Sequence, residues 1–384
     1  MPDDNAYDAF IKHSQNWVFD FPDTPDLREM LKLRMTPEDA RFLSSFPHFP
    51  TTLEELSARF DLPPGEMSAR MAPLLKEGIL YEVEGKSAVR YSLTDGLFFL
   101  GRMKGWLGED SPWSRRFAPV MNRYYDQHFG PDFMGHPTKG LRAIPVNTAV
   151  KDASTILPYE DLLAYVERED YHTVSSCACR HNINMDSTRE NCSHEVEVCL
   201  HFGRLGRYIV KHGMGRKIEK EETLAILKRC ADKGLVHAIS NTKKGMDTIC
   251  NCCSCCCIFL RPIQLSTEVQ REYHQRSNYC LEINGETCIA CGLCAKRCPI
   301  NAITLEDRKD APVPEPGQKP SPKDLKQVAY NPDTCIGCGV CAHKCPTDSL
   351  AMVRRESVED IPENFFEAGV RMIQERGKDP SAMF

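Results

Sequence analysis

Eight cysteines in the C-terminal part of the chain fall into two runs of identical spacing, Cys-x2-Cys-x2-Cys-x3-Cys-Pro. Three thiolates spaced three residues apart on a tight loop can reach three irons of one 4Fe-4S cubane. The fourth thiolate, next to a proline, turns toward the other cubane. The spacing therefore predicts two clusters that exchange their fourth ligands. The predicted ligands are Cys288, Cys291, Cys294 and Cys345 for cluster 1, and Cys335, Cys338, Cys341 and Cys298 for cluster 2.

Structural zinc is the alternative for these two runs. Zinc prefers a closed tetrahedron of four ligands, usually supplied by two Cys-x2-Cys pairs well separated in sequence. Both runs instead keep the spacing of paired cubanes. Gly292, Gly337 and Gly339 also let the loops curl so that backbone N–H groups can face the sulfides. We therefore favour iron-sulfur clusters over zinc.

The two runs resemble the bacterial two-cluster ferredoxins over residues 279–355. The resemblance implies two similar halves, each made of a strand, a cluster loop, a helical turn and a returning strand. The implied strands are Cys280–Ile283 and Ala302–Leu305 in the first half, and Val328–Tyr330 and Ser349–Val353 in the second. One departure is the proline-rich insert 310–322, which cannot join a central strand and is expected to loop out.

Ten further cysteines lie upstream in two patches. Because a cubane takes four cysteines, ten thiols could hold one or two additional 4Fe-4S clusters. Adjacent cysteines project in different directions, so the second patch is not expected to bind a single cluster by itself. Iron-sulfur ligation is favoured over zinc or a redox-active thiol site. The candidates are Cys177, Cys179, Cys192 and Cys199, followed by Cys250, Cys252, Cys253, Cys255, Cys256 and Cys257.

The Cys-x-Cys-Arg motif at 177–180 and the Cys-Asn-Cys-Cys-Ser-Cys-Cys segment at 250–256 are similar to large cysteine-rich ferredoxins of anaerobic bacteria. An anaerobic host is also expected because oxygen damages cubanes. Arg180 is expected to donate hydrogen bonds near sulfur or to balance the negative charge of a cluster, which raises its potential. An ordinary surface ion pair is the alternative for this arginine. Neither cysteine doublet precedes a glycine, so the Cys-Cys-Gly motif of noncubane heterodisulfide-reductase-type clusters is not supported.

Apolar spacing predicts helices at 158–169, 196–211 and 220–233, and hence a mostly helical central domain that folds the second cysteine patch onto the first. Histidines in this region could replace a cysteine, but most are expected simply to be hydrogen-bonded in place. His194 and His201, seven residues apart on one predicted helical face, are the best candidates among His172, His181, His194, His201 and His212. Cys230 and Cys280 are expected to be buried apolar residues rather than ligands.

The N-terminal part has the pattern of a winged helix. Helices are predicted at 37–46, 52–60 and 64–77, and a hairpin from strands 79–83 and 89–93. Between Leu53 and Leu93, five basic residues face seven acidic ones, a balance of −2. Because lysine and arginine contacts to phosphate supply much of the affinity for DNA, this balance favours a structural or protein-docking role.

These observations predict an α+β multidomain protein of five segments. They are a winged-helix-like domain with an N-terminal arm (1–97), a connector (98–151), a helical cysteine-rich domain (152–278), a dicluster ferredoxin domain (279–355), and a C-terminal helix and tail (356–384). The net charge of −6 offers no broad basic surface. The start of the chain lacks a signal-peptide layout and no apolar run is long enough to cross a bilayer, so a cytoplasmic location is expected.

The predicted function is iron-sulfur electron transfer, with single electrons passing through the two ferredoxin-type clusters to or from the central site. The predicted partner is an oxidoreductase or flavoprotein. No acid–base pair, nucleophile constellation or nucleotide-binding glycine motif identifies a substrate, so no catalytic residue is predicted. Two alternatives stay open: a redox-sensing iron-sulfur transcription regulator, and an iron-sulfur subunit whose central cluster is catalytic.

Overall fold

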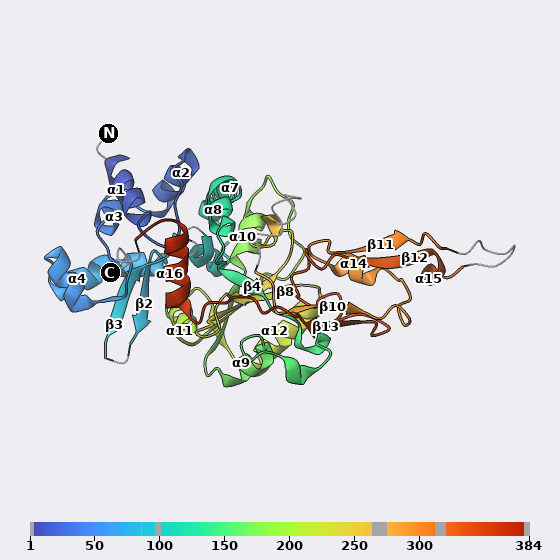
Figure 1. Ribbon diagram of the computed structural model, residues 1–384. Coiled ribbons are helices and arrows are strands. Elements are labelled where there is room, and N and C mark those ends of the chain that lie inside the picture. Colours follow the sequence, from blue (N-terminus) through green and yellow to red (C-terminus); the bar gives the residue numbers. More distant parts are fainter. Residues whose placement is uncertain (1–3, 86, 97–100, 263–274, 312–319, 380–384) are drawn as a thin grey trace.

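The computed structural model describes residues 4–85, 87–96, 101–262, 275–311 and 320–379. Figure 1 shows three regions in sequence along one long axis: helices and a hairpin at one end, a sheet in the middle, and a narrow arm at the other end. Within the described ranges, no helix has the length and apolar character needed to span a bilayer.

The N-terminal region contains the expected helices and hairpin. Thr36 and Thr52 cap two of the helices through reciprocal hydrogen bonds with Asp39 and Glu55, so one begins at Pro37 as predicted and the other at Leu53, directly after its predicted first residue. The elements are α1 (Asp4–Ser14), α2 (Pro25–Arg34), α3 (Pro37–Leu43), β1 (Thr51–Thr52), α4 (Leu53–Phe60), α5 (Pro64–Lys76), β2 (Leu80–Glu84) and β3 (Val89–Leu93). Strand β3 lies between β1 and β2 in a three-stranded sheet.

The connector packs against both neighbouring regions. Helix α7 contacts α2 of the N-terminal region and α10 of the central region. Trp106 is buried and meets the ring of His201 edge-on, with centroids 4.5 Å apart. The connector elements are α6 (Met103–Leu107), α7 (Pro112–Tyr124), α8 (Gly130–Gly135) and the short strand β4 (Leu141–Ala143).

The centre of the molecule is a six-stranded antiparallel sheet of order β4-β8-β9-β6-β5-β7. Its remaining strands are β5 (His172–Ser176), β6 (Glu197–Phe202), β7 (Arg216–Ile218), β8 (Val236–Ser240) and β9 (Thr248–Cys252). The helices around it are α9 (Leu162–Arg168), α10 (Ala178–Met185), α11 (Gly203–Lys211) and α12 (Lys220–Asp232). The prediction of a mostly helical central domain is therefore wrong.

Residues 196–211, where the apolar spacing predicts one helix, instead form a strand followed by a helix. Residues 197–202 form β6, and only residues 203–211 form helix α11. Residues 198–202 are all buried, so both faces of the strand are covered. A strand buried on both faces reads as a continuous apolar run, which periodicity alone cannot distinguish from a helix. The helix expected at 158–169 is also shorter and begins at Leu162, after the capping Asp161.

The arm (residues 279–354) consists of two small sheets that tie its two halves together. Strand β10 pairs with β13 and β11 pairs with β12, so each strand pairs with one from the other half. The elements are β10 (Tyr279–Ile283), α14 (Leu293–Arg297), β11 (Ile303–Asp307), α15 (Pro322–Leu325), β12 (Lys326–Tyr330) and β13 (Leu350–Arg354). All four implied strands are present. Residues 312–319 of the expected insert lie outside the described residues.

The arm is fixed to the central region at the C-terminal end of α12. Arg297 donates hydrogen bonds to the carbonyl oxygens of Ala231 (2.8 Å) and Asp232 (3.1 Å), and to Val340 O (3.0 Å) within the arm. The Asp232 carboxylate meets His343 Nε2 at 2.9 Å and Lys344 Nζ at 2.8 Å. Cations at a helix C-terminus also complement the helix dipole, so the arm and the sheet form one continuous scaffold.

The last helix, α16 (Phe365–Glu375), lies in the segment where the sequence predicts a C-terminal helix, and it packs against the rest of the protein. The Glu375 carboxylate accepts hydrogen bonds from the backbone N–H and hydroxyl of Thr138. Arg376 forms an ion pair of 3.2 Å with Asp132. Figure 1 shows this helix beside the N-terminal hairpin, so α16 lies at the same end of the molecule as the N-terminal region.

Candidate metal centres

Two cavities in the arm bring the eight repeat cysteines together in the predicted sets. The first is lined by Cys288, Cys291, Cys294 and Cys345. The second is lined by Cys335, Cys338, Cys341 and Cys298. In each set, the cysteine before proline crosses over from the other run, because it leaves its own loop in extended conformation: Cys298 has φ −67° and ψ 114°.

Local backbone geometry shapes the two cavities for anionic sulfur. Gly292 and Gly337 adopt left-handed conformations with φ of +72° and +74°. Backbone N–H groups donate to sulfur from Ala302 to Cys298 Sγ at 3.2 Å, and from Gly337 to Cys335 Sγ at 3.4 Å. Such hydrogen bonds stabilise thiolate ligands and tune the potential of the cluster they hold.

We expect Gly337→Ala to destabilise the arm. A Cβ at this position would lie 2.1 Å from Ser277 Oγ and 2.3 Å from the carbonyl oxygen of Tyr279, and the left-handed backbone adds a further strain of about 1 kcal/mol. The variant should bind less iron and have a lower melting temperature. Gly285→Ala is the matched control, because no atom lies within 4 Å of its Cβ position. Equal iron content and melting temperature in both variants would contradict this expectation.

In the central region, the sheet brings the two upstream cysteine patches together. Cys177 follows β5 and Cys179 lies in the first turn of α10. Cys199 lies on β6, while Cys250 and Cys252 lie on the adjacent strand β9. The chain then turns through residues 253–257. This turn places the remaining cysteines of the second patch in two neighbouring sets of thiols.

Four of the ten thiols form a compact set that we call the four-thiol group. The Sγ atoms of Cys192, Cys253, Cys255 and Cys256 all lie within 4.8 Å of one another. Cys192 Sγ is 3.6 Å from Cys255 Sγ and 3.9 Å from Cys253 Sγ. Four convergent sulfurs are the ligand set of a cubane, and they equally satisfy tetrahedral zinc.

The other six thiols form a second set, the six-thiol group. It consists of Cys177, Cys179, Cys199, Cys250, Cys252 and Cys257, which line a single buried cavity. Contacts link them in a chain, from Cys177 to Cys179, Cys257, Cys252, Cys250 and Cys199. Cys253 and Cys256 of the four-thiol group border the same cavity, so the two groups adjoin.

Crowding within the six-thiol group lowers the pKa of two thiols, Cys250 and Cys257, while the pKa of the other four is raised. Burial acts to raise the pKa of the Cys257 thiol, but hydrogen bonds with Cys179 and Cys252 outweigh burial and lower its pKa to about 5. Hydrogen bonds from Cys199 and Cys252 likewise lower the pKa of Cys250. Because the thiolate is the form that ligates metal, Cys250 and Cys257 are the thiols of this group that ionise most readily to ligand form.

Two buried arginines supply positive charge to these groups. Arg180 donates from Nη2 to Cys253 Sγ at 3.5 Å, so the predicted hydrogen bond to sulfur is present. Arg102 donates from Nη2 to Cys250 Sγ at 3.8 Å. Burial acts to lower the pKa of Arg102, but Cys250, Cys179 and Cys199 outweigh burial and raise it. Both side chains therefore carry full charge beside the sulfurs.

Sequence reasoning missed Arg102. It lies in the connector just before α6, far from every cysteine along the chain, and no local motif distinguishes it from a surface arginine. Only the packing of α6 against β5 and α10 brings it to the six-thiol group.

The histidines do not complete the metal centres. His201 lies on strand β6, so it shares no helical face with His194, and that prediction is wrong. Its Nε2 is 2.8 Å from Ser175 Oγ and its Nδ1 is 3.2 Å from Thr248 Oγ1. His172 is similarly bonded to Thr223 and Glu169, and His212 to Glu82. His181 is buried on α10, and the four-thiol group described above contains no histidine.

Cys230 and Cys280 are the two cysteines that the sequence does not predict to be ligands. Neither lines one of the two arm cavities, and neither belongs to the four-thiol or the six-thiol group. Cys230 is buried in α12, as predicted. Cys280 lies on β10 and is only partly buried, so it is less enclosed than predicted. Both provide controls for substitutions at the other eighteen cysteines.

Comparison with known families agrees with the geometry of the arm. The family model of the 4Fe-4S dicluster domain matches residues 287–349, which contain both cysteine runs. The chain therefore carries a ferredoxin-type 4Fe-4S dicluster domain in its C-terminal part. No curated protein sequence matches the chain.

Proposed function

We propose that this protein transfers single electrons through iron-sulfur clusters, two in the arm and two in the central region. The observation that carries the proposal is the convergence of eighteen cysteines into four sulfur-lined sites: two cavities in the arm, the four-thiol group and the six-thiol group. This convergence supports cluster ligation, and none of the twenty cysteines forms a disulfide.

In this proposal each arm cavity holds one cubane, with Cys298 and Cys345 exchanged between the runs. The four-thiol group holds a third cluster. The six-thiol group supplies the ligands of a fourth and has two thiols beyond the four that a cubane needs. The clusters supply reversible one-electron chemistry when bound. The residues of this chain hold them, exclude water and adjust their potentials.

Arg102 and Arg180 are proposed to raise the potentials of the central clusters. A unit charge about 5 Å from a cluster contributes roughly 3 kcal/mol at an effective dielectric constant of about 20, which is on the order of 100 mV for one electron. Arg102→Leu should therefore lower the midpoint potential of one central cluster by on the order of 100 mV, as measured by a redox titration followed by electron paramagnetic resonance.

Two further variants test the cause of that shift. Arg102→Lys retains the charge and should restore most of the potential. Arg207→Leu removes an arginine that is half exposed, paired with Asp170 and stacked on Tyr171, and it should shift no potential. An unchanged potential in Arg102→Leu, with its clusters intact, would show that this arginine does not act on a cluster.

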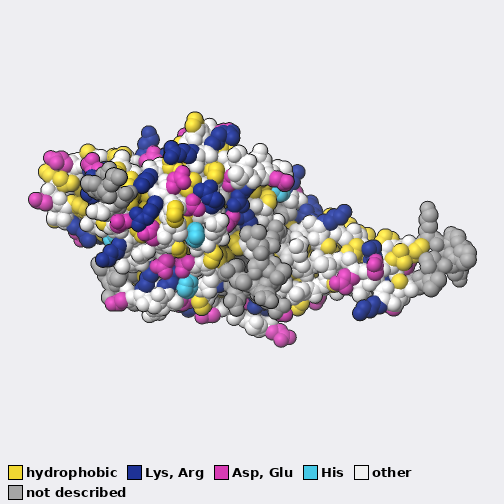
Figure 2. Space-filling model, turned by 90° about the horizontal axis from the view of Figure 1, so that it is seen from above, with side chains coloured by type: hydrophobic (Ala, Val, Ile, Leu, Met, Phe, Trp, Pro, Cys, Tyr) yellow, Lys and Arg dark blue, Asp and Glu magenta, His cyan; other side chains and the backbone are white. Residues whose placement is uncertain are grey.

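The N-terminal region is proposed to be a winged-helix-like domain (1–97) that docks protein rather than DNA. Arg70, one of two basic residues on α5, is held by Asp39 at 2.7 Å and lies over the Phe42 ring. Figure 2 shows basic and acidic side chains intermixed over the visible face, without a broad basic surface. The regulator alternative predicts salt-sensitive gel shifts with DNA, which this proposal does not expect.

The partner is proposed to be an oxidoreductase or flavoprotein in a reducing, anaerobic cytoplasm. Twenty unpaired cysteines support a reducing compartment. The exposed arm, which projects from the rest of the molecule in Figure 1, is the part best placed to meet a partner. A reductive titration of the anaerobic protein tests the function: uptake of about four electrons per chain supports it. Uptake of two would limit electron transfer to the arm.

A further inference from the structure

The four sulfur-lined sites differ in how far their cysteines reach the surface. All twenty cysteines lie in the described ranges, and of these only Cys255 and Cys291 are exposed. Cys255 belongs to the four-thiol group, and Cys291 lines the cavity of cluster 1. The cysteines of cluster 2 and of the six-thiol group are all buried or half-buried. Two of the four sites therefore reach the surface, and the other two lie inside the molecule.

The surface at cluster 1 is open and partly apolar. Ile289 and Leu293 line the cavity of this cluster, and their side chains are 46 % and 37 % exposed. They flank the exposed Cys291 along the chain. An electron crosses only a short distance between redox centres, so a partner must approach a cluster that lies near the surface. Cluster 1 meets this requirement, and the arm that carries it projects from the rest of the molecule (Figure 1).

Cluster 2 lies against the central region. The N–H of Val146 donates to the carbonyl oxygen of Cys338 at 3.1 Å, and on the same segment the N–H of Ile144 donates to His237 O at 2.9 Å. His237 on β8 pairs with Asn251 on β9, and its Nδ1 is 2.8 Å from Asn251 Oδ1. Asn251 lies between two cysteines of the six-thiol group. A hydrogen-bonded route therefore joins cluster 2 to the six-thiol group.

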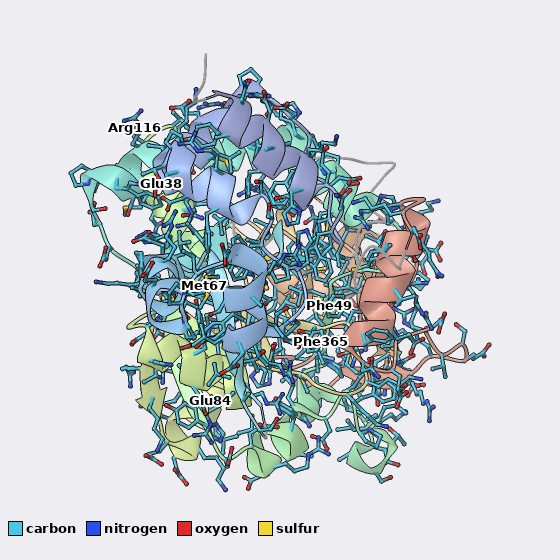
Figure 3. The ribbon with its side chains drawn as sticks, turned by 90° about the vertical axis from the view of Figure 1, so that its left-hand side faces the viewer. Glu38, Phe49, Met67, Glu84, Arg116 and Phe365 are labelled. Carbon is cyan, nitrogen blue, oxygen red and sulfur yellow. The ribbon has the colours of Figure 1, made fainter. Side chains whose placement is uncertain are left out.

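The six-thiol group in turn adjoins the four-thiol group. Cys252 and Cys253 are neighbours in the chain but belong to different groups, as do Cys257 and Cys256. The buried Trp106 of the connector also lines the cavity of the six-thiol group. Figure 3 views the molecule from the end opposite the arm and shows the N-terminal helices in front of the central region. The six-thiol group therefore lies in the interior, in contact with the four-thiol group.

We propose that this protein connects two different redox partners, a one-electron donor at cluster 1 and a one-electron acceptor at the four-thiol group. An electron then passes from cluster 1 to cluster 2, to the six-thiol group and to the four-thiol group. Arg102 and Arg180 favour this direction, because their positive charge beside the sulfurs raises the potentials of the central clusters. At each step one centre is oxidised and the next is reduced, and no bond forms or breaks. The inference rests on the proposed function and adds a second site of electron exchange.

The first test measures how close each cluster lies to solvent. A dysprosium chelate in solution speeds the electron spin relaxation of clusters near the surface of the reduced full-length protein. Single cysteine variants assign each signal to its cluster. We expect the signals of cluster 1 and of the four-thiol group to relax faster with the chelate than those of cluster 2 and the six-thiol group.

Two results of this test would overturn the proposal. One is a four-thiol signal that the chelate affects no more than the signal of cluster 2. The other is a four-thiol group without any redox signal, because a centre that accepts no electron cannot serve an acceptor. In both cases the signals of the other clusters would still support the proposed function, so the failure of this inference is distinguishable from the failure of that function.

The second test closes the two routes to the six-thiol group. The oxidised full-length protein is mixed with dithionite, and reduction is followed by rapid-freeze electron paramagnetic resonance. Cys298→Ser removes cluster 2 and Cys192→Ser removes the cluster of the four-thiol group. Each variant leaves one route open, so the six-thiol cluster should keep its fast phase of reduction. The double variant closes both routes and should lose this fast phase.

The matched control is the double variant Cys230→Ser/Cys280→Ser, which changes two thiols outside all four sites and should keep the fast phase. If either single variant already lost the fast phase, one of the two routes would not exist and the proposal would be wrong. A fast phase that persisted in Cys298→Ser/Cys192→Ser would show direct access to the six-thiol group and contradict the order of transfer. Should this double variant fail to fold, the relaxation measurement on the unmodified protein decides.

Discussion

Replacing Cys298 with serine is expected to remove cluster 2, although this cysteine belongs to the run that holds cluster 1. It lines the cavity formed by Cys335, Cys338 and Cys341, and its thiol receives the backbone N–H of Ala302. Anaerobically purified Cys298→Ser should contain about four fewer irons per chain and lack the signal of one arm cluster in electron paramagnetic resonance.

Cys345→Ser is the reciprocal variant and should remove cluster 1 instead. The two variants can be told apart because Cys298 lines only the second cavity and Cys345 only the first, so each variant should keep the cluster signal that the other loses. Cys280→Ser, in the same arm but in neither cavity, should keep all iron. If Cys298→Ser and Cys345→Ser lost the same cluster, the exchange of ligands would be wrong.

Replacing Cys192 with serine is expected to empty the four-thiol group while the six-thiol group stays loaded. Cys192 is the one member of that group that comes from the first cysteine patch, and its Sγ lies 3.6 Å from Cys255 Sγ. The loss should amount to about four irons per chain if the group holds a cubane. The redox signal of the remaining central cluster should persist.

The matched control is Cys230→Ser. This thiol is buried in α12 and lies in neither central group, so the substitution should leave the metal content unchanged and reduce stability only modestly. If Cys192→Ser retained the full metal content, Cys192 would not be a ligand. If it lost the metal of both groups, the ten thiols would form one site and the division into four and six would be wrong.

The parts of this protein that could be predicted from sequence are those set by local rules. The Cys-x2-Cys-x2-Cys-x3-Cys-Pro spacing determines which thiols share a cavity. This rule is sufficient to group Cys345 with Cys288, and Cys298 with Cys335. The starts of two N-terminal helices could also be predicted closely, because Thr36 and Thr52 form capping boxes with residues three positions further along the chain, whereas the helix predicted to end at residue 46 ends at Leu43.

The central region could not be predicted in the same way, because long-range contacts determine it. Val198, Leu200 and Phe202 are buried in a strand whose neighbours β5 and β9 come from distant parts of the chain. The division of the ten thiols depends on how the turn at 253–257 meets that sheet. No spacing rule specifies that Cys253 faces Cys192 while Cys252 faces Cys250.

The central claim is tested most directly by counting iron, acid-labile sulfide and zinc in anaerobically purified full-length protein. Four cubanes predict about sixteen irons and sixteen sulfides per chain, with no zinc. About twelve irons with one zinc would assign zinc to the four-thiol group and keep one central cluster. Eight irons or fewer would contradict the account, because metal clusters would then be absent from the central region.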